Sequence, residues 1–269
     1  MIAERSATNT PMTIENQLDL LEIRNETFLR DLRYFEEAES TNTLANELAA
    51  TDCDTPLVVL AQRQTAGRGR NENQWWSSEG ALTFTLLMDL PVRNVSDIGP
   101  FSLTVGLAVC QALERFAPAA DLALKWPNDV YFNDKKICGI LIERPVASEP
   151  RLSIGIGINV NNSLGDAPEE LRTGATSLLD ELRSPQPLTA VLVQVLQRIE
   201  ELAREHIHNR DRLIDQWRAY CMLTGRTVTI DQQGRQVRGV CRGVELDGSL
   251  VLQTEESEVK CISGVVADF

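Results

Sequence analysis

Residues 57–70 read LVVLAQRQTAGRGR, and this segment constrains the architecture more than any other part of the chain. Its first five residues are apolar, which predicts a buried β-strand. The loop that follows, residues 62–73, contains no bulky apolar side chain. Its glycines let the backbone approach a ligand closely, and its arginines carry permanent charge suited to carboxylate or phosphate. A solvated basic turn would show the same four-residue pattern, but its position after a buried strand favours a binding loop.

Two further segments concentrate polar residues and glycines. Residues 125–130 read KWPNDV and are followed by KKICGIL at 135–141. A hairpin between them would bring Lys125 and Lys136 near the same end of a sheet. Residues 154–161 read IGIGINVN, so strand alternation puts Gly155, Gly157 and Asn159 on one face. A strand face without side chains accommodates a flat ligand or a second backbone. Taken alone, residues 125–141 are better explained by an exposed hairpin turn. Residues 154–161 are equally explained by close packing of a sheet on a helix.

The pattern of apolar residues around these segments predicts an α+β fold. Strands are expected at residues 29–35, 57–61, 81–88, 136–143 and 152–160, and helices after Ser40 or Thr41 as N-cap, at 103–116, and across 188–220 as one long or two short helices. After Cys221, short β-like runs are separated by turn signals at Gln233-Gly234 and Asp247-Gly248. They predict a small barrel-like domain packed on the larger one.

Composition narrows the classes of function. The chain has 269 residues and a formal net charge of −13, so its surface repels phosphate backbones and DNA binding is not expected. The six cysteines form no CxxC pair, and the only histidines are His206 and His208, which disfavours a zinc site. No signal peptide is visible in the first thirty residues, and no apolar stretch has the length of a bilayer span. A cytoplasmic protein with reduced thiols and no membrane contact is expected.

The motifs in combination resemble biotin–protein ligase, also called biotin–[acetyl-CoA-carboxylase] ligase. The resemblance rests on Ser40-Thr41-Asn42, Gln64 with Gly67-Arg68-Gly69-Arg70, Lys125-Trp126-Pro127-Asn128-Asp129, Lys136-Ile137-Cys138-Gly139-Ile140-Leu141 and Gly155-Ile156-Gly157-Ile158-Asn159-Val160. It runs from about residue 35 to residue 179 and resumes at residues 223–226. It implies a class II synthetase-like mixed sheet flanked by helices and a small C-terminal SH3-like β-barrel. The expected division is an N-terminal extension at 1–28, a catalytic domain at 29–221 and the β domain at 222–269.

The resemblance implies a reaction in two steps. Biotin and ATP first give biotinyl-5′-AMP, and the biotinyl group then passes to one lysine of a biotin carboxyl carrier protein. Magnesium is expected to accompany ATP. The N-terminal extension is too short for the DNA-binding domain of bifunctional members, so a monofunctional ligase is expected, and the family also makes a homodimer possible.

The resemblance assigns roles residue by residue. Residues implied to bind biotin are Ser40, Thr41, Asn42, Gln64, Arg68, Gly69, Arg70, Lys136, Gly139 and Gly155. Residues implied to bind ATP or the adenylate are Arg70, Trp75, Lys125, Asn128 and Asn159. Lys136, Arg70 and Arg68 are the expected catalytic residues, because positive charge offsets the repulsion between a carboxylate and the α-phosphate. Asp129 is the expected magnesium ligand.

Two alternatives remain open from the sequence. A lipoate or octanoate–protein ligase would share the sheet and a lysine like Lys136, although the glycine-arginine loop together with residues 125–129 indicates biotin. A sensor that binds biotinyl-AMP without transferring it would keep the same pocket. ATP–pyrophosphate exchange with different acids separates these three functions.

Overall fold

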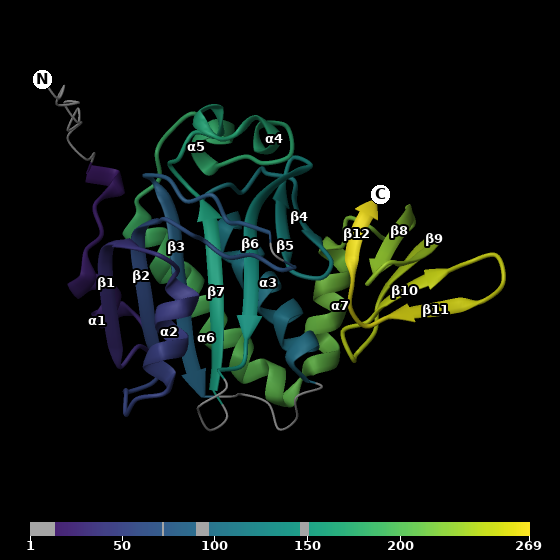
Figure 1. Ribbon diagram of the computed structural model, residues 1–269, viewed down its shortest axis with the longest axis horizontal. Helices are drawn as coiled ribbons and strands as arrows, with labels where there is room; N and C mark the ends of the chain where they lie inside the picture. Colours follow the sequence, from purple (N-terminus) through teal and green to yellow (C-terminus); the bar gives the residue numbers. More distant parts are fainter. Residues whose placement is uncertain (1–13, 72, 90–96, 146–150) are drawn as a thin grey trace, which may run out of the picture.

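The computed structural model describes residues 14–71, 73–89, 97–145 and 151–269. Residues 1–13 of the expected N-terminal extension lie outside the described residues, as does Glu72 of the glycine-arginine loop. The described chain forms a seven-stranded mixed sheet flanked by helices and a second, five-stranded antiparallel sheet (Figure 1). This confirms the predicted α+β class with two sheets.

The larger sheet has the strand order β1-β2-β3-β7-β6-β5-β4. Its strands are β1 (Asp31–Ala38), β2 (Leu57–Gln64), β3 (Ala81–Asp89), β4 (Leu122–Lys125), β5 (Asp129–Phe132), β6 (Lys135–Glu143) and β7 (Arg151–Asn159). Only the β1–β2 pair is parallel, and every other neighbouring pair in this sheet is antiparallel. The tight connections β4–β5–β6 confirm the predicted hairpin after Lys125.

Helices cover both faces of the larger sheet (Figure 1). One face carries α2 (Thr41–Ala49), and the other carries the pair α3 (Ile98–Glu114) and α6 (Leu188–His208). The remaining helical segments are η1 (Ile14–Asn16), α1 (Leu20–Glu26), η3 (Leu164–Asp166), α4 (Glu169–Arg172), α5 (Leu178–Leu182) and α7 (Arg210–Tyr220). Within the described ranges, no helix has the length and apolar character needed to cross a membrane.

Strand β2 shows why the sequence reads as a continuous apolar run. Leu57 and Val59 pack with the helix α2, while Val58 and Leu60 belong to the main core on the opposite face. Because successive side chains point to opposite faces and both faces are covered, every residue of the run must be apolar. Burying one such side chain stabilises the fold by roughly 1.5–3 kcal/mol.

The structure corrects two expectations from the sequence and decides a third. Helix α3 begins at Ile98 rather than at 103, because Pro100 stands in the first turn, where the missing N–H costs no helical hydrogen bond. The last strand of the chain, β12 (Val265–Asp268), was not predicted, and it pairs with β8 (Thr227–Gln232). The pattern at 188–220 is two helices rather than one, since Asn209 between them has a non-helical backbone.

The smaller sheet packs beside α7 and the β4–β5 end of the larger sheet (Figure 1). Its other strands are β8 (Thr227–Gln232), β9 (Arg235–Val244), β10 (Leu250–Gln253) and β11 (Glu258–Cys261). Both predicted turns are confirmed, with positive φ at Gln233, Gly234 and Gly248. The Trp126 indole donates a buried hydrogen bond of 3.0 Å to the Gly248 carbonyl oxygen, which fixes one sheet against the other.

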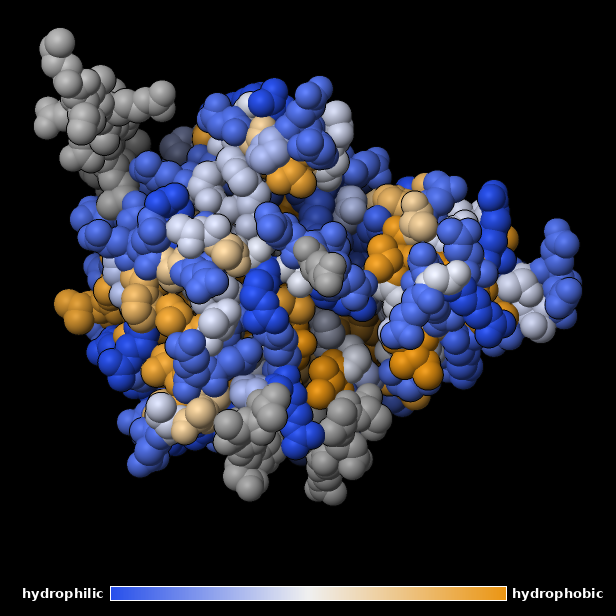
Figure 2. All heavy atoms as spheres, viewed as in Figure 1, coloured by the Kyte–Doolittle hydropathy of each residue, from blue (hydrophilic) through white to orange (hydrophobic). Residues whose placement is uncertain are grey.

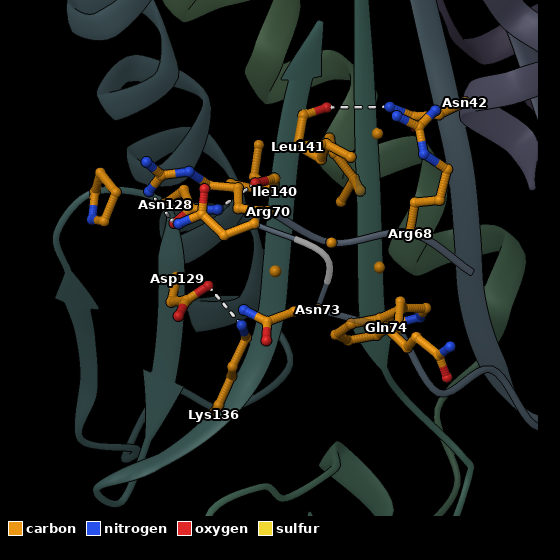
Figure 3. A pocket seen from close by; sticks show the side chains of 18 of the residues that line it. Asn42, Arg68, Arg70, Asn73, Gln74, Asn128, Asp129, Lys136, Ile140 and Leu141 are labelled. Atoms are coloured by element: carbon orange, nitrogen blue, oxygen red, sulfur yellow. Dashed lines mark hydrogen bonds and ion pairs between the residues drawn. The ribbon is translucent and has the colours of Figure 1, made fainter. Parts of the chain in front are cut away.

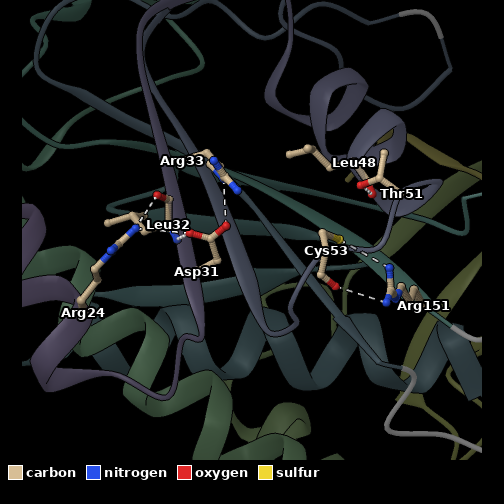
Figure 4. A network of polar contacts seen from close by, with 8 residues as sticks. All are labelled: Arg24, Asp31, Leu32, Arg33, Leu48, Thr51, Cys53 and Arg151. Atoms are coloured by element: carbon tan, nitrogen blue, oxygen red, sulfur yellow. Dashed lines mark hydrogen bonds and ion pairs between the residues drawn. The ribbon is translucent and has the colours of Figure 1, made fainter.

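Polar contacts of two arginines attach outer segments, helix α1 and the loop before β2, to strands of the larger sheet (Figure 4). The Arg24 guanidinium donates to the Leu32 carbonyl oxygen at 3.1 Å, which holds α1 against β1. The Arg151 guanidinium donates to the Cys53 carbonyl oxygen at 3.4 Å, which holds the first residue of β7 against the loop before β2. Both arginines therefore give carbonyl groups a partner and keep these outer segments attached to the sheet.

A buried histidine on α6 makes the stability of the fold dependent on pH. The His206 ring is 1% exposed, bonds the Thr104 hydroxyl at 2.8 Å and packs edge-on against Phe101. Burial, with the Arg210 charge added, lowers the pKa of His206 from 6.5 to about 4. The unfolded chain therefore takes up this proton at a higher pH than the folded chain, so acid favours unfolding.

We expect the free energy of unfolding to fall by about 2 kcal/mol between pH 7 and pH 5 through His206 alone. Urea denaturation of wild type and His206→Gln at both pH values measures it, because the glutamine does not titrate. The control is His208→Gln, which removes an exposed histidine of the same helix. An equal pH response in wild type and His206→Gln would show that His206 does not carry this effect.

Candidate active site

The three segments singled out in the sequence meet in one pocket, on the face of the larger sheet that carries α2. The cavity has a volume of about 150 Å³. That volume corresponds to about five water molecules at roughly 30 Å³ each, and a cavity of about this size accommodates an organic ring such as benzene. Figure 2 shows this face hollowed where the larger sheet meets the C-terminal sheet. The predicted residues that line the cavity are Ser40, Thr41, Asn42, Gln64, Arg68, Gly69, Arg70, Trp75, Lys125, Asn128, Asp129, Lys136, Gly139 and Gly155.

One end of the pocket is a buried, neutral, hydrogen-bonding wall at the start of α2. The Gln64 side-chain oxygen accepts from the Thr41 amide at 2.6 Å and from its hydroxyl at 3.0 Å. Thr85 of β3 donates to the Asn42 oxygen at 2.6 Å. Ser40 stands at the N-cap position as predicted, but its side chain forms no capping hydrogen bond. Its hydroxyl therefore remains available to the pocket that it lines.

The other end of the pocket is cationic (Figure 3). The Lys136 ammonium lies 2.7 Å from an Asp129 oxygen, and Arg70 donates to the Asn128 side-chain oxygen at 3.4 Å. Asn128 is itself held by a hydrogen bond from its amide group to the Ile140 carbonyl. Lys125 also lines this end, with its ammonium 3.3 Å from the Tyr131 hydroxyl.

Burial and neighbouring charges act on these cations in opposite directions. Burial lowers the pKa of Arg70, and the Asp129 carboxylate partly opposes that effect. Burial also lowers the pKa of Lys125, Asp129 raises it, and the Lys136 charge lowers it again. Three cations around one carboxylate leave a net positive charge at this end of the pocket, which favours an anionic ligand.

Glycines form the floor between the two ends. A Cβ at Gly157 would clash with the Trp75 indole, and a Cβ at Gly155 would clash with the Asn42 side-chain oxygen. Only glycine admits these contacts, because heavy atoms do not approach a real Cβ so closely. The predicted bare strand face is therefore occupied by side chains of this chain, with Trp75 over Gly157 and near Gly139.

Asn159 is the one predicted site residue that does not line the pocket. It is 4% exposed, donates to the Thr176 carbonyl oxygen and accepts from Asn162, each at 3.0 Å. The Lys136 backbone is bonded to the same segment, through Gly174 and Thr176. Asn159 thus helps to hold the segment that supports Lys136, at the end of the same strand as the glycine floor.

Several residues at the pocket were missed from the sequence, among them two on β6 and three near the C-terminus. Leu141 lines the cavity and Glu143 lies beside it, and the two-residue strand period applied from Gly139 would have found both on β6. Residues 264–266 come from the C-terminal part of the chain and close one side of the pocket. No sequence signal indicated them, because nothing in a single sequence states where a second sheet packs.

The site offers little to a metal ion on its own. Among the residues that the structure describes, no group of three or more histidine, cysteine, aspartate or glutamate side chains could hold one. Asp129 is a single carboxylate, and it already pairs with Lys136. This set fits only a hard cation that arrives with most of its oxygen ligands already supplied by a polyphosphate and water.

The glycine floor generates a prediction. Gly157→Ala should displace the Trp75 indole rather than β7, because Trp75 is on a loop and β7 pairs on both sides. Quenching of tryptophan emission by acrylamide should therefore be stronger in Gly157→Ala than in wild type. In a Trp75→Phe background, adding Gly157→Ala should leave the quenching unchanged, because the indole that moves has been removed. Gly174→Ala is the control, since a Cβ there meets nothing within 4 Å. Unchanged quenching in Gly157→Ala would contradict the packing described.

Comparison with known proteins identifies the family. A model of the biotin/lipoate A/B protein ligase family matches residues 34–161. The chain is 32% identical to the bifunctional ligase/repressor BirA of Bacillus subtilis over 90% of this chain and 75% of that protein. It is 31% identical to the biotin–[acetyl-CoA-carboxylase] ligase of Mycobacterium tuberculosis over 88% of each.

A solved structure agrees with the sequence relatives. The biotin protein ligase from Aquifex aeolicus in complex with biotin and ATP superposes with a TM-score of 0.77 and 31% identity, covering 88% of this chain and 97% of that one. The similarity therefore extends over most of the described chain. The chain belongs to the biotin/lipoate A/B protein ligase family, and within it to the biotin–protein ligases.

Proposed function

We propose that this protein is an ATP-dependent biotin–[biotin carboxyl carrier protein] ligase. It activates biotin as biotinyl-5′-AMP and transfers the biotinyl group to a lysine of a carrier domain such as that of acetyl-CoA carboxylase. The observation that carries the proposal is one pocket with a neutral hydrogen-bonding wall, a glycine floor and a cationic end. Biotin has a polar ureido head on a compact fused ring system and a carboxylate at the end of an aliphatic chain, so its parts match these three regions in order.

The neutral wall selects the ureido head. Ser40, Thr41, Asn42 and Gln64 provide donors and acceptors without charge, which suits a neutral urea. The ring system lies at the edge of the glycine floor, against the Asn42 side chain that covers Gly155 and the Trp75 indole near Gly139. Arg68 and Gly69 belong to the loop that covers this ring system.

The cationic end promotes attack on ATP. An oxygen of the biotin carboxylate forms a bond to the α-phosphorus, and the bond from that phosphorus to the bridging oxygen breaks to release pyrophosphate. Lys136 and Arg70 offset the repulsion between the two anions and stabilise charge that develops in the transition state. The carrier lysine then attacks the acyl carbon, and AMP leaves.

The nucleotide uses the rest of the cationic end. Lys125 and Asn128 hold phosphate oxygens, since both line the pocket beside Arg70. Trp75 stacks on the adenine, and Asn159 supports that side of the pocket from beneath. Magnesium neutralises the polyphosphate when bound, and Asp129 is the carboxylate placed to orient it or a phosphate-bound water.

Arg68 enters this proposal with a restricted role. Its guanidinium lies 2.5 Å from Glu143, so its charge is largely compensated before any ligand binds. We assign it to loop closure over the adenylate rather than to the phosphoryl step.

The remaining assignments are also proposals. The larger unit, residues 29–221, is a class II synthetase-like catalytic domain, and residues 222–269 form an SH3-like barrel, since five short antiparallel strands make up that sheet. The six cysteines are unpaired in the structure, which is typical of the cytoplasm. The net charge of −13 disfavours DNA as a partner. A homodimer would use the β1 edge of the larger sheet, because the β4 edge is already bonded by the segment that leads to the smaller sheet.

ATP–pyrophosphate exchange with biotin, lipoate, octanoate or no acid tests the function. We expect exchange with biotin alone, because the neutral wall matches the ureido head, which lipoate and octanoate lack. Exchange driven by lipoate or octanoate would assign the chain to the other branch of its family. Tight biotin binding without exchange would make it a sensor.

Lys136→Ala should reduce biotin-dependent exchange by about 10²–10³-fold, the usual effect of losing one preorganised group that stabilises transition-state charge. Thermal melting should show an intact fold. Lys135→Ala is the matched control, since Lys135 is the exposed neighbour and does not line the pocket. Exchange at nearly the wild-type rate in Lys136→Ala would remove this lysine from the mechanism.

A further inference from the structure

Glu143, the last residue of β6, joins two parts of the pocket that come from different segments of the chain. Its carboxylate accepts from Arg68 of the glycine-arginine loop at 2.5 and 3.3 Å, one contact to each oxygen. It also accepts from the Asn42 side-chain amide at 2.9 Å and from Asn46 at 3.3 Å, both on α2. One partly buried anion therefore ties a loop and a helix to the strand that carries Lys136.

The contact with Asn42 fixes which end of that amide faces the glycine floor. The Asn42 nitrogen points to Glu143 and to the Leu141 carbonyl, while its oxygen accepts from Thr85 and lies over Gly155. Glu143 has no proton to donate when ionised, so it accepts only from the nitrogen. The pocket is thereby presented with an oxygen, an acceptor suited to a ureido N–H.

The contact with Arg68 restrains the loop. The loop is closed by its own backbone hydrogen bonds, from the Gly69 amide to the Asn73 carbonyl at 2.7 Å and from the Trp75 amide to the Gly67 carbonyl at 2.9 Å. These bonds shape the loop but do not attach it to the opposite side of the pocket. Arg70 makes one long contact of 3.4 Å with Asn128, and the shorter, paired hydrogen bonds from Arg68 to Glu143 supply the stronger attachment, since a bidentate pair holds orientation as well as distance.

We infer that Glu143 is a positioning residue with two separable actions. It orients Asn42 for the polar head of the acid, and it holds the glycine-arginine loop against the pocket through Arg68. The contact between Glu143 and Arg68 is called the latch below. The inference rests on the proposed function for the identity of the ligand. The latch itself follows from the contacts of Glu143 alone. Glu143 acts through these two partners, because its hydrogen bonds go to them and to Asn46 rather than to the pocket interior.

Two substitutions separate the actions. Glu143→Gln keeps an oxygen that accepts from Asn42 but removes the charge that holds Arg68. Glu143→Ala removes both contacts. Glu200→Gln is the matched control, because the Glu200 side chain is 26% exposed against 23% for Glu143 and also pairs with an arginine, Arg204, but lies on α6 away from the pocket.

The rate of amide hydrogen exchange in the loop measures the effect of the latch without any substrate. Exchange of the Gly69, Asn73 and Trp75 amides should be faster in both Glu143 variants than in wild type and Glu200→Gln. In the enzyme assay, release of biotinyl-AMP into solution, followed by labelling of bystander albumin, should rise about two- to fivefold in both Glu143 variants. The KM for biotin should rise about tenfold in Glu143→Ala only, with kcat changed less, because that variant alone removes the acceptor oxygen at position 143 and leaves the buried Asn42 amide with only the longer contact to the Leu141 carbonyl.

Unchanged loop exchange in both variants would overturn the latch. An equal KM for biotin in Glu143→Ala and wild type would overturn the orienting role. If both Glu143 variants melted at an equally lowered temperature, while loop hydrogen exchange and the KM for biotin stayed at their wild-type values, Glu143 would have only a structural role as an ion-pair partner. If wild type showed no biotin-dependent ATP–pyrophosphate exchange, the proposed function would fail. Amide hydrogen exchange in the loop would still test the contact between Glu143 and Arg68 on its own.

Discussion

The register of the central strands is the constraint on which the site depends. Gly139 of β6 pairs directly with Gly157 of β7, and Gly157 pairs on its other side with Thr83 of β3. Two neighbouring strands therefore lack side chains at the same point, and the floor is wider than a single glycine would make it. A slip of one residue would turn isoleucines such as Ile156 and Ile158 toward the pocket and bury the glycines in the main core.

The charge at one end of the pocket is opposite in sign to the net charge of the chain. The protein carries a net charge of −13, yet one end of the pocket gathers Arg70, Lys125 and Lys136 around a single aspartate. The cost of burying these groups is reduced by Asp129 and by hydrogen bonds to Asn128 and Tyr131. An anionic ligand would complete the compensation, so the site gains most from a ligand that brings negative charge with it.

The sequence predicted the elements that obey a local rule. The buried strand β2, the turns at Gln233-Gly234 and Asp247-Gly248, and the glycine face of β7 all follow from periodicity or turn chemistry, and the structure has them. What the sequence did not predict depends on contacts between distant segments. The attachment of Glu143 to Arg68, the placement of β12 and the burial of Asn159 under residues 174–176 all need the tertiary structure.

The wall that residues 264–266 add to the pocket has a thermodynamic consequence. The cavity begins at Ser40 and ends on β12, so it is shared by two sheets that each have their own strands and turns. A ligand that contacts both sides of this cavity binds best when both sheets are folded and in contact, and its binding free energy is then added to the stability of both at once. Occupancy therefore makes the two units unfold more cooperatively, and the bound molecule acts as part of the interface between them.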